Sequence, residues 1–214
     1  VFVMQGSESV SSVCFNSSLQ NYGGDIAVGA MTILTSVMQF AMLPLQGLGQ
    51  GAQPIISYNY GAGNMKRVRR TFRLLLQSSL AYSTILWLLI LLFPQGFAAM
   101  FTSDPELMIF TRTALRIYMA ACVIFGIQIA CQMTFNALGN AVESITVAVV
   151  RKFVLLIPLI YLMPMLLKGD QAKAVYMAEP IADVIAVMFT ACLFFFRFKK
   201  TLEKENAESG GKGN

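Results

Sequence analysis

Residues 44–70, PLQGLGQGAQPIISYNYGAGNMKRVRR, combine the features from which the architecture of this 214-residue chain can be inferred. They begin inside a long apolar segment that Pro44 and Pro54 interrupt, pass through a turn with Gly61 and Gly63, and end in a cluster of Lys and Arg residues. An apolar segment of this length followed by a basic cluster is typical of a membrane helix that ends in the cytoplasm. The stretch therefore predicts a membrane-spanning helix, a short turn and the start of a second helix.

The composition of the whole chain also indicates a membrane protein. Hydrophobic residues make up 56% of the sequence and charged residues only 13%, with a mean hydropathy of +0.63. A soluble domain carries roughly 25% charged residues, so a soluble enzyme, a disordered chain and a secreted disulfide scaffold are excluded. The chain has no histidine, and its four cysteines lie in apolar stretches without CxxC spacing. We therefore predict neither an enzyme nor a metal site.

Hydropathy predicts an all-α integral membrane protein with six transmembrane helices. Five spans are apolar enough to be assigned directly, whereas the more polar segment 1–20 is assigned from the topology described below. The six predicted spans cover about residues 1–20, 26–56, 74–93, 117–138, 145–167 and 175–196. Residues 201–214 are rich in Gly, Glu and Lys, which predicts a disordered cytoplasmic tail.

The positions of the basic residues predict how the chain is oriented in the membrane. Twelve of the 16 lie at 66–73, at 151–152 or after residue 196, and the other four lie on the opposite side of the predicted spans. The side with the excess is cytoplasmic, so the C-terminus is expected in the cytoplasm. Asp25 then lies outside, which requires a crossing before it. Because topology accounts for the charge, no nucleic-acid partner is predicted.

Short polar sequences mark the connections between the predicted helices. Residues 22–25, YGGD, predict a glycine turn on the outer side. Residues 103–106, SDPE, match a capping box with Ser103 as the N-cap, and Asn64 is expected to cap the helix that follows it. Arg151 and Lys152 lie near the start of the fifth predicted span, and we expect them to extend to the cytoplasmic headgroups.

Three predicted helices each carry a polar stripe on an otherwise apolar surface, because residues four apart lie on one helical face. In the first of them the stripe consists of Glu8, Ser12 and Asn16. Such amides either join packed helices by hydrogen bonds or line a polar cavity. Three separate stripes favour the cavity, whose predicted lining residues are Gln39, Gln46, Gln50, Gln53, Gln128, Gln132 and Asn136.

Glu8 and Asp183 are carboxylates within predicted spans. A charge at the bilayer centre costs about 2.5–3.5 kcal/mol on insertion scales, so such a residue has a partner or a role. Two interpretations stay open for both residues, namely handling of a cation or proton and a buried structural hydrogen bond. The hypothesis that we carry forward is that Glu8 and Asp183 bind or relay a coupling cation.

Residues 50–64, QGAQPIISYNYGAGN, resemble the motif after the second helix of the C-terminal lobe in bacterial multidrug and toxic compound extrusion (MATE) transporters. Weaker matches lie at 132–139, QMTFNALG, and 179–184, EPIADV. The resemblance implies a multi-pass protein of the bacterial inner membrane with two six-helix lobes. Such transporters export cationic or amphipathic drugs by alternating access, in exchange for H⁺ or Na⁺ and without another cofactor. The chain resembles the C-lobe alone, so we expect an N-lobe of similar size as its partner.

The resemblance also has implications for individual residues. In sodium-coupled relatives a carboxylate in the first C-lobe helix contributes to the cation site, and Glu8 lies near the matching position. Those relatives also use an aspartate in the fourth C-lobe helix, whereas residues 125–128, FGIQ, contain none. This departure weakens the expectation of a sodium site in this lobe.

Two other functions remain open. A flippase for lipid-linked sugars would line its cavity with Arg or Lys to bind pyrophosphate, and only Arg151 and Lys152 are available at depth. A non-transporting membrane scaffold would have polar stripes that are fully paired and dry.

Overall fold

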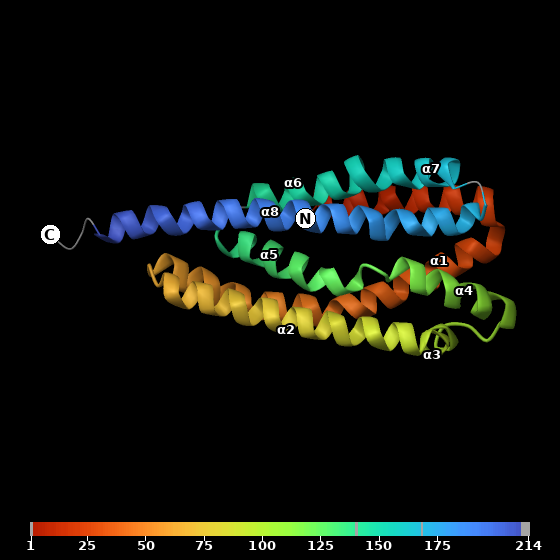
Figure 1. Ribbon diagram of the computed structural model, residues 1–214, viewed down its shortest axis with the longest axis horizontal. Helices are drawn as coiled ribbons and strands as arrows, with labels where there is room; N and C mark the ends of the chain where they lie inside the picture. The colour runs from red at the N-terminus through yellow and green to blue at the C-terminus, as the bar shows by residue number, and fades with distance from the viewer. Residues whose placement is uncertain (1, 140, 168, 211–214) are drawn as a thin grey trace.

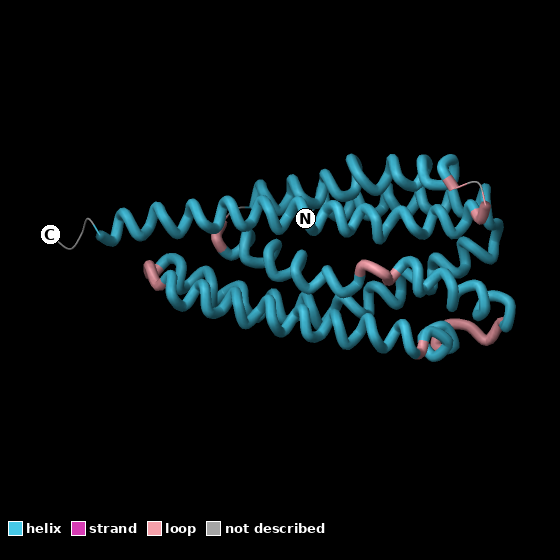
Figure 2. Tube along the Cα trace, viewed as in Figure 1, coloured by secondary structure: helices cyan, strands magenta, loops and turns pink. Residues whose placement is uncertain are grey.

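The computed structural model describes residues 2–139, 141–167 and 169–210, with side chains described for 6–139, 145–167 and 169–196. This part of the chain is helical and contains no strand, which confirms the all-α prediction (Figures 1 and 2). The elements in chain order are α1 (Phe2–Gly61), α2 (Met65–Leu92), α3 (Pro94–Ala99), α4 (Pro105–Tyr118), η1 (Cys122–Ile124), α5 (Phe125–Ala137), α6 (Ala141–Val149), η2 (Val150–Leu156), α7 (Ile157–Leu166) and α8 (Gln171–Gly210).

The element α1 is a hairpin of two helices that reverse direction at Gly24. Figure 1 shows its red part running to one end of the molecule and its orange part running back. Gly24 has φ 62° and ψ −159°, a conformation that is essentially restricted to glycine. The Gln20 side chain donates a 2.9 Å hydrogen bond to Asp25 Oδ1 across the turn. The predicted glycine turn at residues 22–25 is therefore confirmed.

Several helices are long and apolar enough to cross a membrane. Four such segments occur among the described residues, and a fifth forms if α4 and the bent continuation Cys122–Ala137 count as one span. The four are Gly6–Gly61, Met65–Leu92, Ile145–Leu166 and Gln171–Phe196. Because the first of them contains the reversal at Gly24, the order of the helices follows the predicted order of spans, while the number of crossings stays a prediction.

The helices pack in two layers around a continuous apolar core. The first half of α1 packs with α7 and α8, whereas the second half packs with α2 and α5 (Figure 1). Side chains from both layers meet in the core, among them Leu19, Leu34, Leu115 and Tyr176. The buried Tyr176 hydroxyl donates a 2.6 Å hydrogen bond to the Ala27 carbonyl and thereby fixes α8 against α1.

A close approach between α2 and α5 depends on Gly126. A Cβ atom at this position would lie 2.7 Å from the carbonyl carbon and oxygen of Ser79, which belong to the backbone of α2. Next to this contact, the Ser83 hydroxyl donates a 2.9 Å hydrogen bond to the Val123 carbonyl. Val123 lies in the short connection where α4 and α5 are bent by 47°. The helix predicted at 117–138 is thus broken near its start, and a side chain from α2 satisfies a carbonyl there.

Two predicted caps differ in detail from the structure. Asp104, rather than Ser103, is the N-cap of α4, and its Oδ1 accepts a 3.0 Å hydrogen bond from the Glu106 amide. Asp104 can perform this role because its side chain reaches the amide two residues ahead. Asn64 is at the N-cap position of α2, but its side chain makes no capping hydrogen bond.

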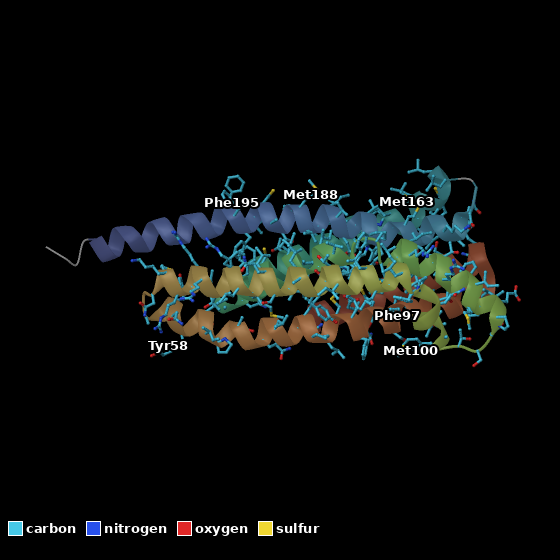
Figure 3. All side chains as sticks on the ribbon, turned by 60° about the horizontal axis from the view of Figure 1, so that its bottom comes forward. Tyr58, Phe97, Met100, Met163, Met188 and Phe195 are labelled. Atoms are coloured by element: carbon cyan, nitrogen blue, oxygen red, sulfur yellow. The ribbon has the colours of Figure 1, made fainter. Side chains whose placement is uncertain are left out.

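The outer surface of the bundle is rich in apolar side chains. Met188 and Phe195 point away from α8 in Figure 3 and are 65% and 68% exposed. Tyr58, close to the α1–α2 turn, is 76% exposed. Such a surface suits contact with lipid. The helix α8 continues to Gly210, past residue 201 where the predicted tail begins, and residues 211–214 lie outside the described residues.

Candidate charge cluster and polar stripes

The π-helix η2 presents two consecutive basic residues to the interior of the bundle. In an α-helix the side chains of neighbouring residues diverge by about 100°, so both rarely face the same core. In η2 the Ile157 amide instead bonds to the carbonyl of Lys152, five residues back, which widens the turn. The side chains of Arg151 and Lys152 are only 16% and 9% exposed. Turns of this kind occur frequently at functional sites.

Arg151 binds two carboxylates of α8. Its Nε donates a 2.6 Å hydrogen bond to Asp183 Oδ1, and its Nη2 contacts the same oxygen. The Nη2 also donates a 3.1 Å hydrogen bond to Glu179 Oε1. Because Glu179 and Asp183 are four residues apart, they lie on one face of α8, toward η2. On the side of α5, the guanidinium carbon of Arg151 lies over the Phe125 ring, 5.9 Å from the ring centre.

Lys152 extends the same set of ion pairs to α1. Its Nζ is 3.1 Å from Glu8 Oε2 and 3.9 Å from Glu179 Oε1. The prediction that both basic residues extend to the headgroups is therefore wrong, because carboxylates from α1 and α8 hold them inside the bundle. We call the connected set the charge cluster, and its members in order of contact are Glu8, Lys152, Glu179, Arg151 and Asp183.

The charge cluster has more acidic than basic groups. With all members ionised, three carboxylates face two basic groups, which leaves one surplus negative charge. Asp183 is fully buried, and its Oδ2 has no hydrogen-bond partner. Glu8 at the other end has a side chain that is 60% exposed. The surplus charge is therefore hardest to solvate at Asp183, since desolvation penalises a buried charge.

The two predicted coupling residues thus belong to one charge cluster without touching each other. Glu8 and Asp183 lie at its opposite ends, separated by Lys152, Glu179 and Arg151. Prediction from sequence missed the three connecting residues as members of a site. A signal was present, because adjacent basic residues inside one apolar span and carboxylates four residues apart in another invite pairing within the bilayer.

The glutamines of α1 lie on the side of its second half that faces away from the core. The buried face of this half includes Val37, Ala41 and Leu45. At about 100° per residue, the four glutamines point about a third to a half of a turn away from that face. Of the predicted cavity residues, the exposed ones are Gln39, Gln46 and Gln50, the half-buried ones are Gln53, Gln132 and Asn136, and Gln128 is buried. No hydrogen bond between these amides is seen in the described part of the chain.

The amide stripe of α5 faces the same side as the charge cluster. Phe125, Gln128, Gln132 and Asn136 are spaced three, four and four residues apart and therefore share one helical face. Phe125 is the residue whose ring contacts the Arg151 guanidinium. The Oε1 atom of Gln128, one turn further along, is buried without a hydrogen-bond partner. The stripe thus leads along α5 from the charge cluster toward the end at Ala137.

Comparison with known proteins identifies relatives of the chain. The MatE family model matches residues 1–162. The FAD transporter of Shewanella oneidensis is 27% identical over 168 residues, which cover 78% of this chain and 35% of that protein. The multidrug export protein MepA of Staphylococcus haemolyticus is 22% identical over 162 residues, 76% of this chain and 35% of that protein. The matched part of the chain therefore spans about a third of the length of these curated relatives.

Solved structures show the same helical arrangement. An inward-facing multidrug resistance MATE family transporter of the MOP superfamily has a TM-score of 0.87 at 17% identity, over 94% of this chain and 46% of that chain. The MATE multidrug transporter DinF-BH in complex with R6G has a TM-score of 0.79 at 31% identity, over 94% of this chain and 44% of that chain. Because the family model covers most of its length, the chain belongs to the MatE family of multi-pass membrane transporters.

Proposed function

We propose that the chain forms the C-terminal lobe of a cation-coupled multidrug antiporter that exports cationic or amphipathic compounds by alternating access. Membership of the MatE family and likeness to proteins named for multidrug export support this proposal. The proposal includes a second lobe of similar size, the bacterial inner membrane, a cytoplasmic C-terminus, and H⁺ or Na⁺ as the coupling ion. The chain spans less than half of the solved transporters that it matches, which leaves room for that second lobe.

The polar stripes would form part of the wall of the substrate cavity. The amides of Gln46 and Gln50 are exposed, and Gln128 has a buried oxygen without a partner. Amides that are not bonded within the lobe remain free to bind a guest molecule or water. This observation disfavours a scaffold, for which the stripes should be fully paired.

Glu8 and Asp183 would carry the coupling cation at the two ends of the charge cluster. The surplus negative charge supports this role, because a buried site with one excess carboxylate attracts a single positive charge. Ion pairs connect the cluster across α1, η2 and α8. Neutralising one of its members therefore changes the contacts between helices.

The state of the two buried basic residues favours a cationic over an anionic substrate. A lipid-linked sugar or FAD carries a pyrophosphate, which requires free Arg or Lys groups for its binding. Arg151 and Lys152 are already engaged with carboxylates. The charge cluster as a whole is negative, which suits the export of cations and is the observation that carries this choice of substrate class.

Accumulation of ethidium in a bacterial strain that lacks its own multidrug pumps tests the proposed function. We expect cells that express the full protein containing this chain to accumulate several-fold less dye than cells with an empty vector. The double variant Gln46→Leu and Gln50→Leu should lose most of this difference, whereas Gln77→Leu on the exposed face of α2 serves as the matched control. Equal accumulation with and without the protein, or export of FAD but not of the dye, would contradict the proposal.

A further inference from the structure

The carboxylate of Asp183 is bound at only one of its two oxygens. Both Nε and Nη2 of Arg151 converge on Oδ1, although a guanidinium can bind both oxygens of a carboxylate side by side. The second oxygen, Oδ2, is buried without a hydrogen-bond partner in a side chain with 0% exposure. An ionised carboxylate in such surroundings has one oxygen without a partner, which adds to the free-energy cost of burying its charge.

We propose that Asp183 is the group of the charge cluster that accepts a proton, and that its ion pair with Arg151 is lost when the proton binds. This inference rests on the proposed function, for which it specifies the coupling ion and the residues that carry it. The proton comes from a hydronium ion, whose O–H bond breaks to leave water, and it binds a lone pair of Oδ2, so that the carboxylate becomes a neutral acid. Arg151 then keeps its ion pair with Glu179, at 3.1 Å, as its remaining strong contact.

Asp183 accepts the proton more readily than the other two carboxylates of the cluster. Glu8 is 60% exposed, so water solvates its charge. Glu179 Oε1 lies 3.1 Å from Arg151 Nη2 and 3.9 Å from Lys152 Nζ, so this carboxylate contacts two basic groups. Asp183 has one counter-ion and one unpaired oxygen. Protonation there removes the surplus charge at the place where it is least stabilised.

A proton fits this position better than a sodium ion. Hard metal cations require several oxygen ligands. Among the residues that the structure describes, no group of three or more Asp, Glu, His or Cys side chains is arranged to hold a metal ion. A proton, in contrast, requires only the single lone pair that Oδ2 offers.

The elements packed around Asp183 contribute few other titratable groups. Besides the members of the charge cluster on α1, η2 and α8, the groups in electrostatic range among the described side chains are the phenol of Tyr118 on α4 and the thiol of Cys122 in η1. Both side chains are buried, and both groups are ordinarily neutral near pH 7. The charge state around Asp183 is therefore set by the charge cluster itself.

Protonation of Asp183 changes the contact between α8 and η2. In the ionised state Arg151 bridges Asp183 and Glu179, which are one turn apart on α8. In the neutral state the ion pair with Asp183 is lost, and the guanidinium keeps only its contacts with Glu179 and Phe125. The π-helical turn that carries Arg151 is then held less tightly against α8, which provides a path from proton binding to helix movement.

Carbon NMR of the aspartate side chains tests the proposal directly. The aspartates of the full protein that contains this chain are labelled with ¹³C at Cγ and measured in detergent. The Asp183 signal is identified by its loss in Asp183→Asn. We expect this signal to titrate, and its midpoint should move to higher pH by about 1–3 in Arg151→Gln, since an opposite charge is removed.

Two further variants separate this proposal from a merely structural role. Glu179→Gln removes a like charge next to Asp183, so the midpoint should move to lower pH, in the direction opposite to Arg151→Gln. Arg112→Gln, which changes an exposed arginine of α4, should leave it unchanged. If Arg151→Gln does not fold, the direction in which Glu179→Gln moves the midpoint of the Asp183 titration still tests the proposal. An Asp183 signal that never titrates, that shifts the same way in both variants, or that responds to sodium more than to pH would overturn the proposal.

The titration requires no substrate and is thus independent of the efflux assay. If Asp183 titrates as described but the protein does not export dye, the proposed function fails and the proton site stands. If dye is exported while the Asp183 signal does not respond to pH, the function stands and this inference fails.

Discussion

Lys152 Nζ lies 3.1 Å from Glu8 Oε2, and this ion pair joins the π-helical turn η2 to the first helix of the chain. The two partners differ in their surroundings, because the lysine side chain is 9% exposed and the glutamate side chain is 60% exposed. Glu8 can thus be hydrated on its own, whereas Lys152 depends on its carboxylate partners. The charge cluster therefore has a hydrated end at Glu8 and a dry end at Asp183, and its members should respond differently to substitution.

Removing the basic group at the dry end should destabilise the fold strongly. Arg151→Met is expected to cost about 3–5 kcal/mol of unfolding free energy, because it leaves the Asp183 carboxylate buried without a counter-ion. Glu8→Gln should cost less, because the exposed Glu8 side chain is hydrated and Lys152 keeps Glu179 as a partner at 3.9 Å. Denaturant unfolding of the purified chain in detergent measures both. The double variant Arg151→Met and Asp183→Leu should recover most of the loss, and a double variant as unstable as Arg151→Met would contradict this explanation.

Gly126 should not tolerate a side chain. Alanine at this position would bring a Cβ atom to 2.7 Å from the backbone of Ser79, which can move only together with α2. We expect Gly126→Ala to destabilise the chain by about 1–3 kcal/mol, the usual cost of overpacking. Gly47→Ala is the matched control, since a Cβ there meets nothing within 4 Å. Equal unfolding midpoints for the two variants would show that the α2–α5 contact is looser than described.

The reversal of α1 should depend on glycine at residue 24. With φ 62° and ψ −159°, this position is in a region that costs other residues of order 1–3 kcal/mol. Gly24→Ala is therefore expected to lower the unfolding midpoint. Gly29→Ala, whose Cβ would make an ordinary 3.6 Å contact with Leu107, should change it little. Unfolding curves of both variants in detergent provide the measurement, and a larger effect at Gly29 would refute the assigned role of the turn.

The contacts of Asp170, which lies just before α8, should make the stability of the fold depend slightly on pH. Its Oδ1 accepts a hydrogen bond from the Lys173 amide and its Oδ2 is 2.7 Å from Lys173 Nζ, which lowers the pKa of Asp170 below its ordinary value. A pKa that is lower in the folded state than in the unfolded state adds stability at pH values above the unfolded pKa, which is about 3.9. This added stability is lost as the pH falls through the lower pKa of the folded state. Asp170→Asn should therefore melt at a lower temperature than the wild type at neutral pH but not in acid. A difference that grows in acid would contradict the assignment.

Regular patterns in the sequence predict the helices and turns well. The glycine pair between two apolar segments identifies the reversal at Gly24, and the spacing of Gln128, Gln132 and Asn136 identifies one face of α5. The break after Tyr118 was not predictable in this way, because residues 119–121, MAA, include neither proline nor glycine. That break depends on tertiary packing, which includes the bond from Ser83 to the Val123 carbonyl.

The charge cluster shows where prediction from sequence ends. Glu8 and Asp183 stand out as carboxylates in apolar segments, but nothing local indicates that Arg151 and Lys152 face inward. Their orientation depends on the π-helical turn, which the sequence does not reveal, and on partners that are far apart in the chain. A search for opposite charges within apolar spans would have raised the pairing as a hypothesis. Only the packing of α1 and α8 against η2 determines which partners meet.

Dye efflux driven by an imposed pH gradient tests most directly whether the charge cluster couples a cation to transport. Membrane vesicles that contain the full protein are compared with vesicles that contain the Asp183→Asn variant, at equal amounts of inserted protein. We predict that the gradient drives ethidium transport by the wild type and that the variant loses this response. Transport by Asp183→Asn at the wild-type rate, with the same dependence on the gradient, would contradict a coupling role for the charge cluster.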